Sequence, residues 1–466
     1  MDTYACRLLV LNQECVKCEI RNPKHDIIFE DNDVFNYAQY KDEISRLSQK
    51  ARENDINAGE IKQLGEDLFN TLFNGNIRSK FLECRAETHA HSNLLRIELE
   101  IDEPSLPGFA ALPWEFMYAP DLDERGNFWL ATDPHLAFMR RRPRMDVVAG
   151  FAVASGEKMR IATVIASPQG KTVPYEDFWE DIKKTEQSNN DIQLLELVTE
   201  GTKRNIDKIL NAKPHVFHLL AHGDLKIEGK GNTGFVHLVD VTGDALALSG
   251  PEFAELFTRY GPPIVVLQVC ESGAQDESDA LSGVASQVVD QNVPNVVAMQ
   301  YPVSNVIARQ FMGKFYECIA KREPVEKAVQ EGRREITLGA AGHASRDFTT
   351  PILYSRLVYD KVEKIIDWHI GDIHFWVGHQ NKLTEALLEC ESVADPVTRQ
   401  QIFARLPKDI RHNIGVPNAG ARVQVSNAVR ISTGYPDGVK NLIESVEFFE
   451  RDTVAMQNVK NLLKLD

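Results

Sequence analysis

Two short apolar runs, each ending at a reactive side chain, constrain the fold of this chain more than any other feature. One extends from Phe217 to Ala221 and is followed by His222 and Gly223; the other extends from Ile264 to Val269 and is followed by Cys270. Such runs, bounded by turn residues, are typical of buried parallel strands. In open α/β sheets, catalytic side chains gather beyond the carboxyl ends of the strands. We therefore expect His222 and Cys270 at one edge of a sheet.

A histidine beside a cysteine can perform nucleophilic catalysis. The thiolate is the reactive form of cysteine, and a neighbouring imidazole raises its fraction by accepting the proton. If the two runs are adjacent strands, about 4.8 Å apart, imidazole and thiol can face each other. Free cysteine is also often buried in cores, and Cys318 and Cys390, on apolar helical faces, fit that structural role. Cys270 differs because the chain turns at Gly273, so we interpret Cys270 as the nucleophile.

The order of elements between Met159 and Tyr359 indicates a mostly parallel sheet flanked by helices. We expect its strands at 161–166, 192–198, 215–221, 264–269, 296–300 and 352–358. The predicted fold class is thus α/β, with residues 159–359 as the catalytic subdomain. Residues 1–145 mix weak alternation with helical spacing, which indicates an α+β N-terminal subdomain. Residues 376–466 contain five segments with helical spacing, separated by proline and glycine, which predicts a helical bundle.

Other motifs have structural interpretations. Residues Gly229 to Gly234 match the dinucleotide-binding fingerprint, but that motif must lead into a helix, and here a strand is expected, so we interpret them as a loop. His215 faces away from His218 and His222 because a strand has a period of two. No carboxylate stands at ligand spacing, so we expect no metal and no cofactor, and we interpret His218 as a hydrogen-bonded core residue.

The basic triplet Arg140 to Arg142 and the pair Trp114 and Glu115 also have structural interpretations. Most basic runs are solvated or pair with local carboxylates, so we assign the triplet no ligand. An aromatic residue and a carboxylate after a proline usually anchor a corner of the core, and we expect that role here.

The motifs HLLAHG and VVLQVCESG resemble those of the CHAT branch of the caspase-like cysteine peptidases. The resemblance continues in LPWEFMY, VVAMQYPVS and DFTTPILYSRL and covers roughly residues 92 to 358. It implies a cysteine endopeptidase that cleaves protein substrates, with His222 and Cys270 as catalytic residues. It also implies that the backbone N–H groups of Gly223 and Cys270 form the oxyanion hole.

The same resemblance implies a substrate pocket lined by Gln268, Ser167 and Gln300. Caspase-like relatives use the position of Gln268 to line the pocket for the residue before the cut. Gln268 is a neutral amide, and the first strand of the subdomain ends at Ser167 rather than at a basic residue. Burying a charge without a partner is costly, so we predict a neutral residue before the scissile bond.

The segment from Asp395 to Ile414 resembles the death-like effector-associated domains of bacterial conflict systems. This resemblance implies recruitment to a sensor or adaptor protein with a similar helical domain, in a regulated antiviral defence or cell-death pathway. The alternatives are a catalytically silent scaffold that keeps the fold for binding and a metal-dependent hydrolase.

Composition limits the partners and the compartment. A formal net charge of −16 argues against nucleic acids and anionic membranes. No apolar run reaches the roughly 18 residues of a membrane span, and no signal peptide is evident. Seven scattered cysteines fit a reducing compartment better than a disulfide framework. We therefore expect a cytoplasmic protein.

Overall fold

The chain forms two compact units in the computed structural model: Met1–Arg144 with Lys158–Ile365, and Met145–Glu157 with Ile366–Asp466. The described residues are 3–24, 26–103, 105–120, 126–142, 151–152, 158–228, 231–269, 275–290, 293–356, 366–367, 383–414, 420–432, 438–451 and 453–463.

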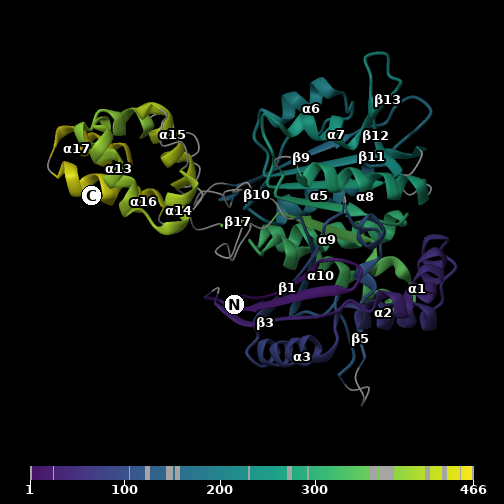
Figure 1. Ribbon diagram of the computed structural model, residues 1–466. Helices are drawn as coiled ribbons and strands as arrows, with labels where there is room; N and C mark the ends of the chain where they lie inside the picture. The colour runs from purple at the N-terminus through teal and green to yellow at the C-terminus, as the bar shows by residue number, and fades with distance from the viewer. Residues whose placement is uncertain are drawn as a thin grey trace. The chain divides into compact units, whose positions relative to one another are not determined.

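One large sheet forms the centre of the first unit, and both predicted subdomains contribute strands to it (Figure 1). In the catalytic half the strands are β9 (Met159–Ile165), β10 (Ile192–Leu194), β11 (Val216–Glu228), β14 (Ile264–Val269), β15 (Asn295–Met299) and β16 (Pro351–Ser355). In the N-terminal half they are β1 (Thr3–Val10), β2 (Cys15–Arg21), β3 (Ile27–Val34), β4 (Leu94–Ile101) and β7 (Leu136–Arg141). The strand order is β10-β9-β11-β14-β15-β16-β7-β4-β1-β2-β3.

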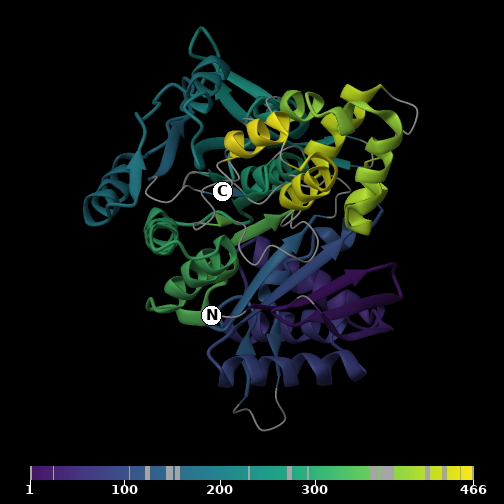
Figure 2. The same cartoon turned by 90° about the vertical axis from the view of Figure 1, so that its left-hand side faces the viewer.

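The two halves meet at β16, which pairs antiparallel with β15 and parallel with β7 (Figure 2). Pairing is parallel from β10 through β15 and again from β16 to β1. The predicted mostly parallel sheet is therefore confirmed. Two further strands extend it: β12 (Gly231–Val239) and β13 (Ala245–Ser249) form a hairpin beside β11. β5 (Tyr118–Ala119) and β6 (Phe128–Trp129) pair in a separate two-stranded sheet.

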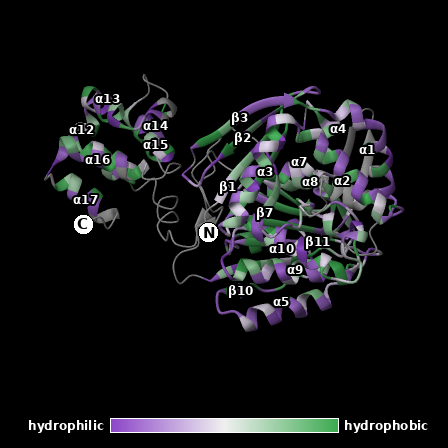
Figure 3. Ribbon diagram, turned by 90° about the horizontal axis from the view of Figure 1, so that it is seen from below, coloured by the Kyte–Doolittle hydropathy of each residue, from purple (hydrophilic) through white to green (hydrophobic). Residues whose placement is uncertain are grey.

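Helices cover the sheet, as predicted for an α/β fold. The N-terminal half contains α1 (Tyr37–Arg52), α2 (Ala58–Leu72), α3 (Gly75–Ala90), α4 (Pro107–Ala110) and η1 (Trp114–Phe116). The catalytic half contains α5 (Glu176–Ser188), α6 (Lys203–Leu210), α7 (Gly250–Ala254), η2 (Glu255–Phe257), α8 (Gln275–Asp290), α9 (Asn305–Ala320), α10 (Val325–Thr337), η3 (Gly342–Ala344) and η4 (Arg346–Thr349). Figure 3 shows hydrophilic and hydrophobic residues alternating along α5, as expected for a helix with one face on a sheet.

The alternation of β11 separates a hydrophobic face from a polar one. Phe217 and Leu219 belong to a core cluster that also contains Phe253 of α7 and Val288 of α8. His218 lies on the opposite face, where its ring contacts Phe178 of α5 and Tyr316 of α9. The side of the sheet that α5 and α9 cover is therefore the side with buried polar groups.

In the second unit the described residues form a helical region with its own hydrophobic core, as predicted. Its helices include α12 (Glu391–Ala394), α13 (Pro396–Arg405), α14 (Lys408–Asn413), α15 (Ala421–Ser432), α16 (Gly438–Glu450) and α17 (Val454–Leu463). Two short strands, β8 (Phe151–Ala152) and β17 (Ile366–Asp367), pair in parallel. Over the described residues, none of the helices has the length and apolar character needed to cross a membrane.

The structure corrects several predicted elements. β11 does not end at Ala221 but continues to Glu228, and residues 231–234 lie in β12 rather than in a loop. α8 begins at Gln275, four residues before the expected cap at Asp279. β3, α3 and α14 were not predicted, because their sequences show little contrast between apolar and polar faces.

Candidate active site

His222 lies where β11 changes its pairing partner. Up to Ala221 the strand pairs in parallel with β14, and Ala221 is the register partner of Val269. From His222 onward β11 pairs antiparallel with β12, and His222 is the register partner of His237. The imidazole is therefore held by a continuous strand rather than by a loop, and its side chain is 5% exposed.

Cys270 lies outside the described residues. Val269, directly before it in the chain, is paired with Ala221, directly before His222. The predicted adjacency of the two strands that lead to His222 and Cys270 is thus confirmed. The predicted oxyanion donor Gly223 lies on β11, opposite Val236 of β12.

The segment after β9, from Ser167 to Val173, contacts His222 and the neighbouring His237. The carbonyl oxygen of Thr172 lies 3.4 Å from His222 Nε2, and Lys171 Nζ lies 3.0 Å from His237 Nδ1. Ser167 shapes this segment, because its hydroxyl accepts a hydrogen bond from Val173 N at 3.0 Å. Ser167 therefore organises the segment that contacts His222.

Gln268 lies two residues before Cys270 and lines a pocket of about 210 Å³. The residues around this pocket come from the segment after β9, from the start of α5, from β14 and from the start of α9: Pro174, Tyr175, Glu176, Asp177, Phe178, Gln268, Asn305 and Arg309. The same segment that contacts His222 through Thr172 thus provides one wall of the pocket. This places a candidate binding pocket beside the candidate base.

A buried chain of polar groups lies behind Gln268. Its Oε1 is 3.1 Å from His218 Nε2, and His218 Nδ1 is 2.9 Å from the hydroxyl oxygen of Tyr316. His218 is fully buried, which confirms its predicted role as a hydrogen-bonded core residue. Burial lowers the pKa of His218 to about 3, although its bond to Gln268 acts in the opposite direction, so the ring is neutral at pH 7.

Gln300 lines a different pocket, of about 280 Å³, together with Tyr301 and Arg140. Its amide nitrogen donates to the Thr349 carbonyl at 2.6 Å and to Glu115 Oε2 at 3.1 Å. Of the three residues predicted to line one substrate pocket, Gln268 therefore lines the pocket beside α5 and α9, Ser167 is not among the described residues that line it, and Gln300 lines a different pocket.

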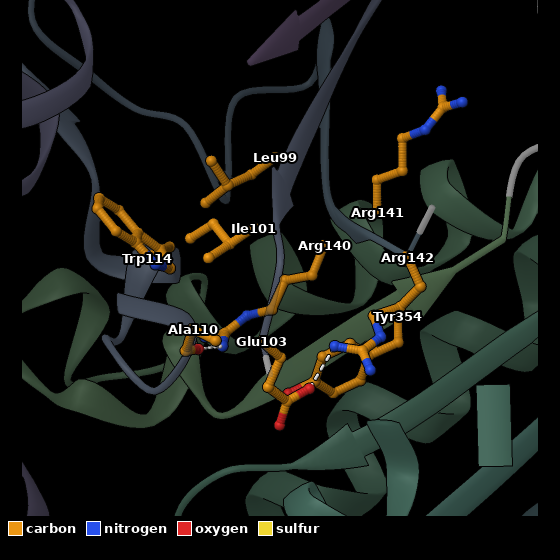
Figure 4. Close-up of a pocket in the computed structure, with 9 residues that line it drawn as sticks. All are labelled: Leu99, Ile101, Glu103, Ala110, Trp114, Arg140, Arg141, Arg142 and Tyr354. Carbon is orange, nitrogen blue, oxygen red and sulfur yellow. Dashed lines mark hydrogen bonds and ion pairs between the residues drawn. The ribbon is translucent and has the colours of Figure 1, made fainter. Parts of the chain in front are cut away.

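The arginine triplet is buried and paired with carboxylates. Arg140 donates to Glu115 at 2.9 Å, Arg141 pairs with Glu98, and Arg142 pairs with Glu103. Figure 4 shows Arg140 and Arg142 around a small cavity of about 20 Å³, while the Arg141 side chain points away from them.

The corner formed by Trp114 and Glu115 has the predicted structural role. Trp114 is 1% exposed and donates from its ring nitrogen to the Phe109 carbonyl at 2.9 Å. Glu115 is completely buried beside Arg140.

Several residues at the site were not found from the sequence. Asn305 and Arg309 lie on α9, and Tyr316 lies two turns further along the same helix. Their spacing is consistent with one face of a helix, but nothing in the sequence places that face against β14.

Among the described residues, no group of three or more histidine, cysteine, aspartate or glutamate side chains is arranged to hold a metal ion.

Comparisons with known proteins match the two parts of the chain to two family models. Residues 62–379 match the CHAT domain, and residues 384–464 match effector-associated domain 2. No curated protein sequence matches the chain.

The similar solved structures include a separase–securin complex and the cysteine proteinase gingipain R. The separase–securin complex of Saccharomyces cerevisiae is 9% identical over 76% of this chain and has a TM-score of 0.43. The alignment spans 30% of the separase chain. The Arg-specific cysteine proteinase gingipain R is 9% identical, with 69% of this chain and 74% of that chain covered, and has a TM-score of 0.38. The complex of Porphyromonas gingivalis RgpB pro- and mature domains is 10% identical, with 68% and 76% covered, and has a TM-score of 0.37.

Proposed function

The chain belongs to the CHAT domain family, and we propose that it is a cysteine endopeptidase in which Cys270 is the nucleophile and His222 its base. The observation that carries this proposal is the register of β11 and β14. Ala221 and Val269 are register partners, and His222 and Cys270 directly follow them in the sequence. This supports a site in which the imidazole and the thiol lie side by side.

The hydrogen bond of His222 supports one assignment of roles to its two ring nitrogens. When Nε2 carries its hydrogen and donates to the Thr172 carbonyl, Nδ1 is the basic nitrogen. Nδ1 then takes the thiol proton of Cys270. This arrangement needs no acidic partner, because a backbone carbonyl fixes the ring.

The reaction then proceeds in two steps. Cys270 Sγ bonds to the substrate carbonyl carbon, and the oxyanion is stabilised by the backbone N–H groups of Gly223 and Cys270. The imidazolium of His222 gives its proton to the leaving amine as the C–N bond breaks, which leaves a thioester. His222 next takes a proton from water, whose oxygen displaces the thiolate and releases the acid.

Labelling with an electrophilic peptide tests the assignment of the nucleophile. We expect mass spectrometry to find the label on Cys270 in the wild type and none in Cys270→Ala. The control is Cys318→Ala, because burial raises the pKa of Cys318 to about 11, so it remains a thiol. A label that persists in Cys270→Ala, or none in the wild type, would support a silent scaffold.

Loss of proteolysis provides the second test. We expect Cys270→Ala and His222→Ala each to lower the rate of peptide cleavage by at least about a thousandfold, because the two residues act as one unit. Cleavage at the wild-type rate by a folded Cys270→Ala variant would contradict the proposal.

We also propose that the second unit recruits the enzyme to a cytoplasmic sensor or adaptor protein that carries a similar helical domain, within a bacterial defence or cell-death pathway. The match of residues 384–464 to effector-associated domain 2 supports this role. Co-purification of the partner with the full chain, and its loss on deletion of residues 376–466, would test it.

A further inference from the structure

The hydroxyl of Tyr316 determines how its neighbours hold their hydrogens. Tyr316 is 1% exposed, and burial raises the pKa of its phenol, so it keeps its proton. Within the described part of the chain, the partner of this hydroxyl is His218 Nδ1, at 2.9 Å. A buried O–H group needs an acceptor, so Tyr316 donates to Nδ1, and Nδ1 carries no hydrogen.

The neutral ring of His218 must then carry its hydrogen on Nε2. This N–H donates to Oε1 of Gln268 at 3.1 Å. The oxygen of the Gln268 amide is thereby fixed on the inner side, towards His218. Within the described residues, the bonds of the Gln268 side chain involve Oε1, which leaves the NH2 group to serve the pocket that Gln268 lines.

The charged side chains that line this pocket are Glu176, Asp177 and Arg309. Arg309 is already paired: its Nε donates to Asp181 at 2.6 Å and its Nη1 to Asp177 at 3.1 Å. An acidic ligand would have to compete with these carboxylates and would also face Glu176, which lines the pocket. A basic ligand would be attracted by the exposed carboxylate of Glu176, but it would also have to approach the Arg309 guanidinium and the N–H donors of Gln268.

We propose that the Tyr316–His218–Gln268 chain holds the Gln268 amide as a hydrogen-bond donor, so that the pocket selects glutamine or asparagine as the residue before the cut. The inference rests on the proposed peptidase function and names its substrate class. A side-chain carbonyl accepts from Gln268, and its uncharged amide avoids the cost of burying a charge beside paired ions. Tyr316 and His218 act as positioning residues, and Gln268 contacts the substrate.

Cleavage of a peptide library tests the class of substrate. We expect glutamine and asparagine before the cut to be preferred over lysine, glutamate and leucine by at least about tenfold in kcat/KM, because the competitors leave the buried donors unpaired. A profile dominated by arginine or lysine, or by aspartate or glutamate, or one without preference, would overturn the inference while leaving the peptidase intact.

Tyr316→Phe tests the positioning chain without changing a residue that lines the pocket. Without the phenolic hydrogen, His218 can place its own hydrogen on Nδ1, and the Gln268 amide can turn its oxygen outward. We expect the preference for glutamine over lysine to fall at least fivefold. Tyr260→Phe is the matched control, because it also removes one phenolic hydroxyl, which in Tyr260 donates to the Pro214 carbonyl. An unchanged preference in Tyr316→Phe, or an equal fall in Tyr260→Phe, would contradict the role of the chain.

Two further measurements test this inference, and the second is independent of the peptidase assignment. If Tyr316→Phe does not fold, Gln268→Glu should move the preference towards lysine, because it replaces the donor by an acceptor. Nitrogen-15 NMR of histidine-labelled protein, assigned with His218→Asn, should show a neutral His218 with its hydrogen on Nε2. This second measurement needs no catalysis, and a hydrogen on Nδ1 would overturn the inference even in an inactive protein.

Discussion

The two halves of the central sheet bury polar groups in opposite ways. The N-terminal half buries charged side chains that pair with one another: Glu98 pairs with Arg96 and Arg141, and Glu115 pairs with Arg140. The catalytic half buries a neutral chain, from Tyr316 through His218 to Gln268, and this chain ends at a pocket. A closed ionic network stabilises one arrangement of strands, whereas an open neutral chain presents a donor to a ligand.

The cost of burial explains the division. Two charges removed from water repay their desolvation only when they are well paired, and removing one partner leaves the other uncompensated. A chain of neutral hydrogen-bonding groups has a lower desolvation cost. Its last donor can therefore remain without a protein acceptor until a ligand binds. The ionic half should therefore respond to mutation mainly in stability, and the neutral half mainly in specificity and pH dependence.

Glu115→Ala should have the largest effect on stability. The substitution leaves the buried Arg140 without its main carboxylate and removes an acceptor of Gln300. We expect the free energy of unfolding to fall by about 3–5 kcal/mol, as measured by urea denaturation. Glu43→Ala, which breaks an exposed pair with Arg46 on α1, is the control and should change stability by less than about 0.5 kcal/mol. Equal effects of the two substitutions would remove the distinction.

The second prediction separates the two halves by pH. Burial lowers the pKa of His218 to about 3 from an ordinary value of 6.5. Below pH 6.5 the unfolded chain therefore binds a proton that the folded chain does not bind, and stability falls as the pH decreases. Between pH 6.5 and 4.5 the loss should be between about 2 and 3 kcal/mol, at about 1.4 kcal/mol per pH unit.

Glu98 should contribute at a lower pH. Burial alone would raise its pKa, but Arg96 and Arg141 lower it to about 2 from an ordinary value of 4.5. Its stabilisation is present above pH 4.5 and is lost as the pH falls towards 2. The free energy of unfolding, measured by urea denaturation, should therefore change less between pH 6.5 and 4.5 in His218→Asn than in the wild type. Glu98→Gln should show the same change as the wild type over this range. If the free energy of unfolding depended on pH equally in His218→Asn and in the wild type, His218 would not be the cause of the loss of stability.

The sequence predicted the strands that lead to His222 and Cys270 because hydrophobic runs bounded by turn residues are local signals. It also predicted that His218 is a hydrogen-bonded core residue. The partners of His218 were not predictable, because Tyr316 comes from α9, 98 residues away along the chain. The continuation of β11 past Ala221 was missed for a related reason: its second partner, β12, supplies the pairing that replaces β14.

Tyr316→Phe should have a small effect on stability in spite of its effect on specificity. The substitution removes one neutral hydrogen bond, and His218 can change tautomer in response. We expect a loss of about 1 kcal/mol in the free energy of unfolding, well below that of Glu115→Ala. A loss as large as that of Glu115→Ala would show that the neutral chain, like the ionic network, mainly supports the fold.

Removal of residues 376–466, the helical part of the second unit, should have the smallest effect. This prediction extends the comparison from the two halves of the sheet to the two units of the chain. Described residues of the catalytic core cluster extend from Ala162 to Tyr354, and those of the C-terminal cluster begin at Leu383, so each unit buries its own hydrophobic residues. We expect a chain that ends at residue 375 to unfold cooperatively, with a free energy of unfolding for the first unit within about 0.5 kcal/mol of its value in the full chain. Differential scanning calorimetry should show one transition fewer than the full chain shows. Aggregation of the shorter chain, or a broad and weakly cooperative transition, would mean that the units share a core, and recruitment through the second unit would then be coupled to the stability of the catalytic sheet.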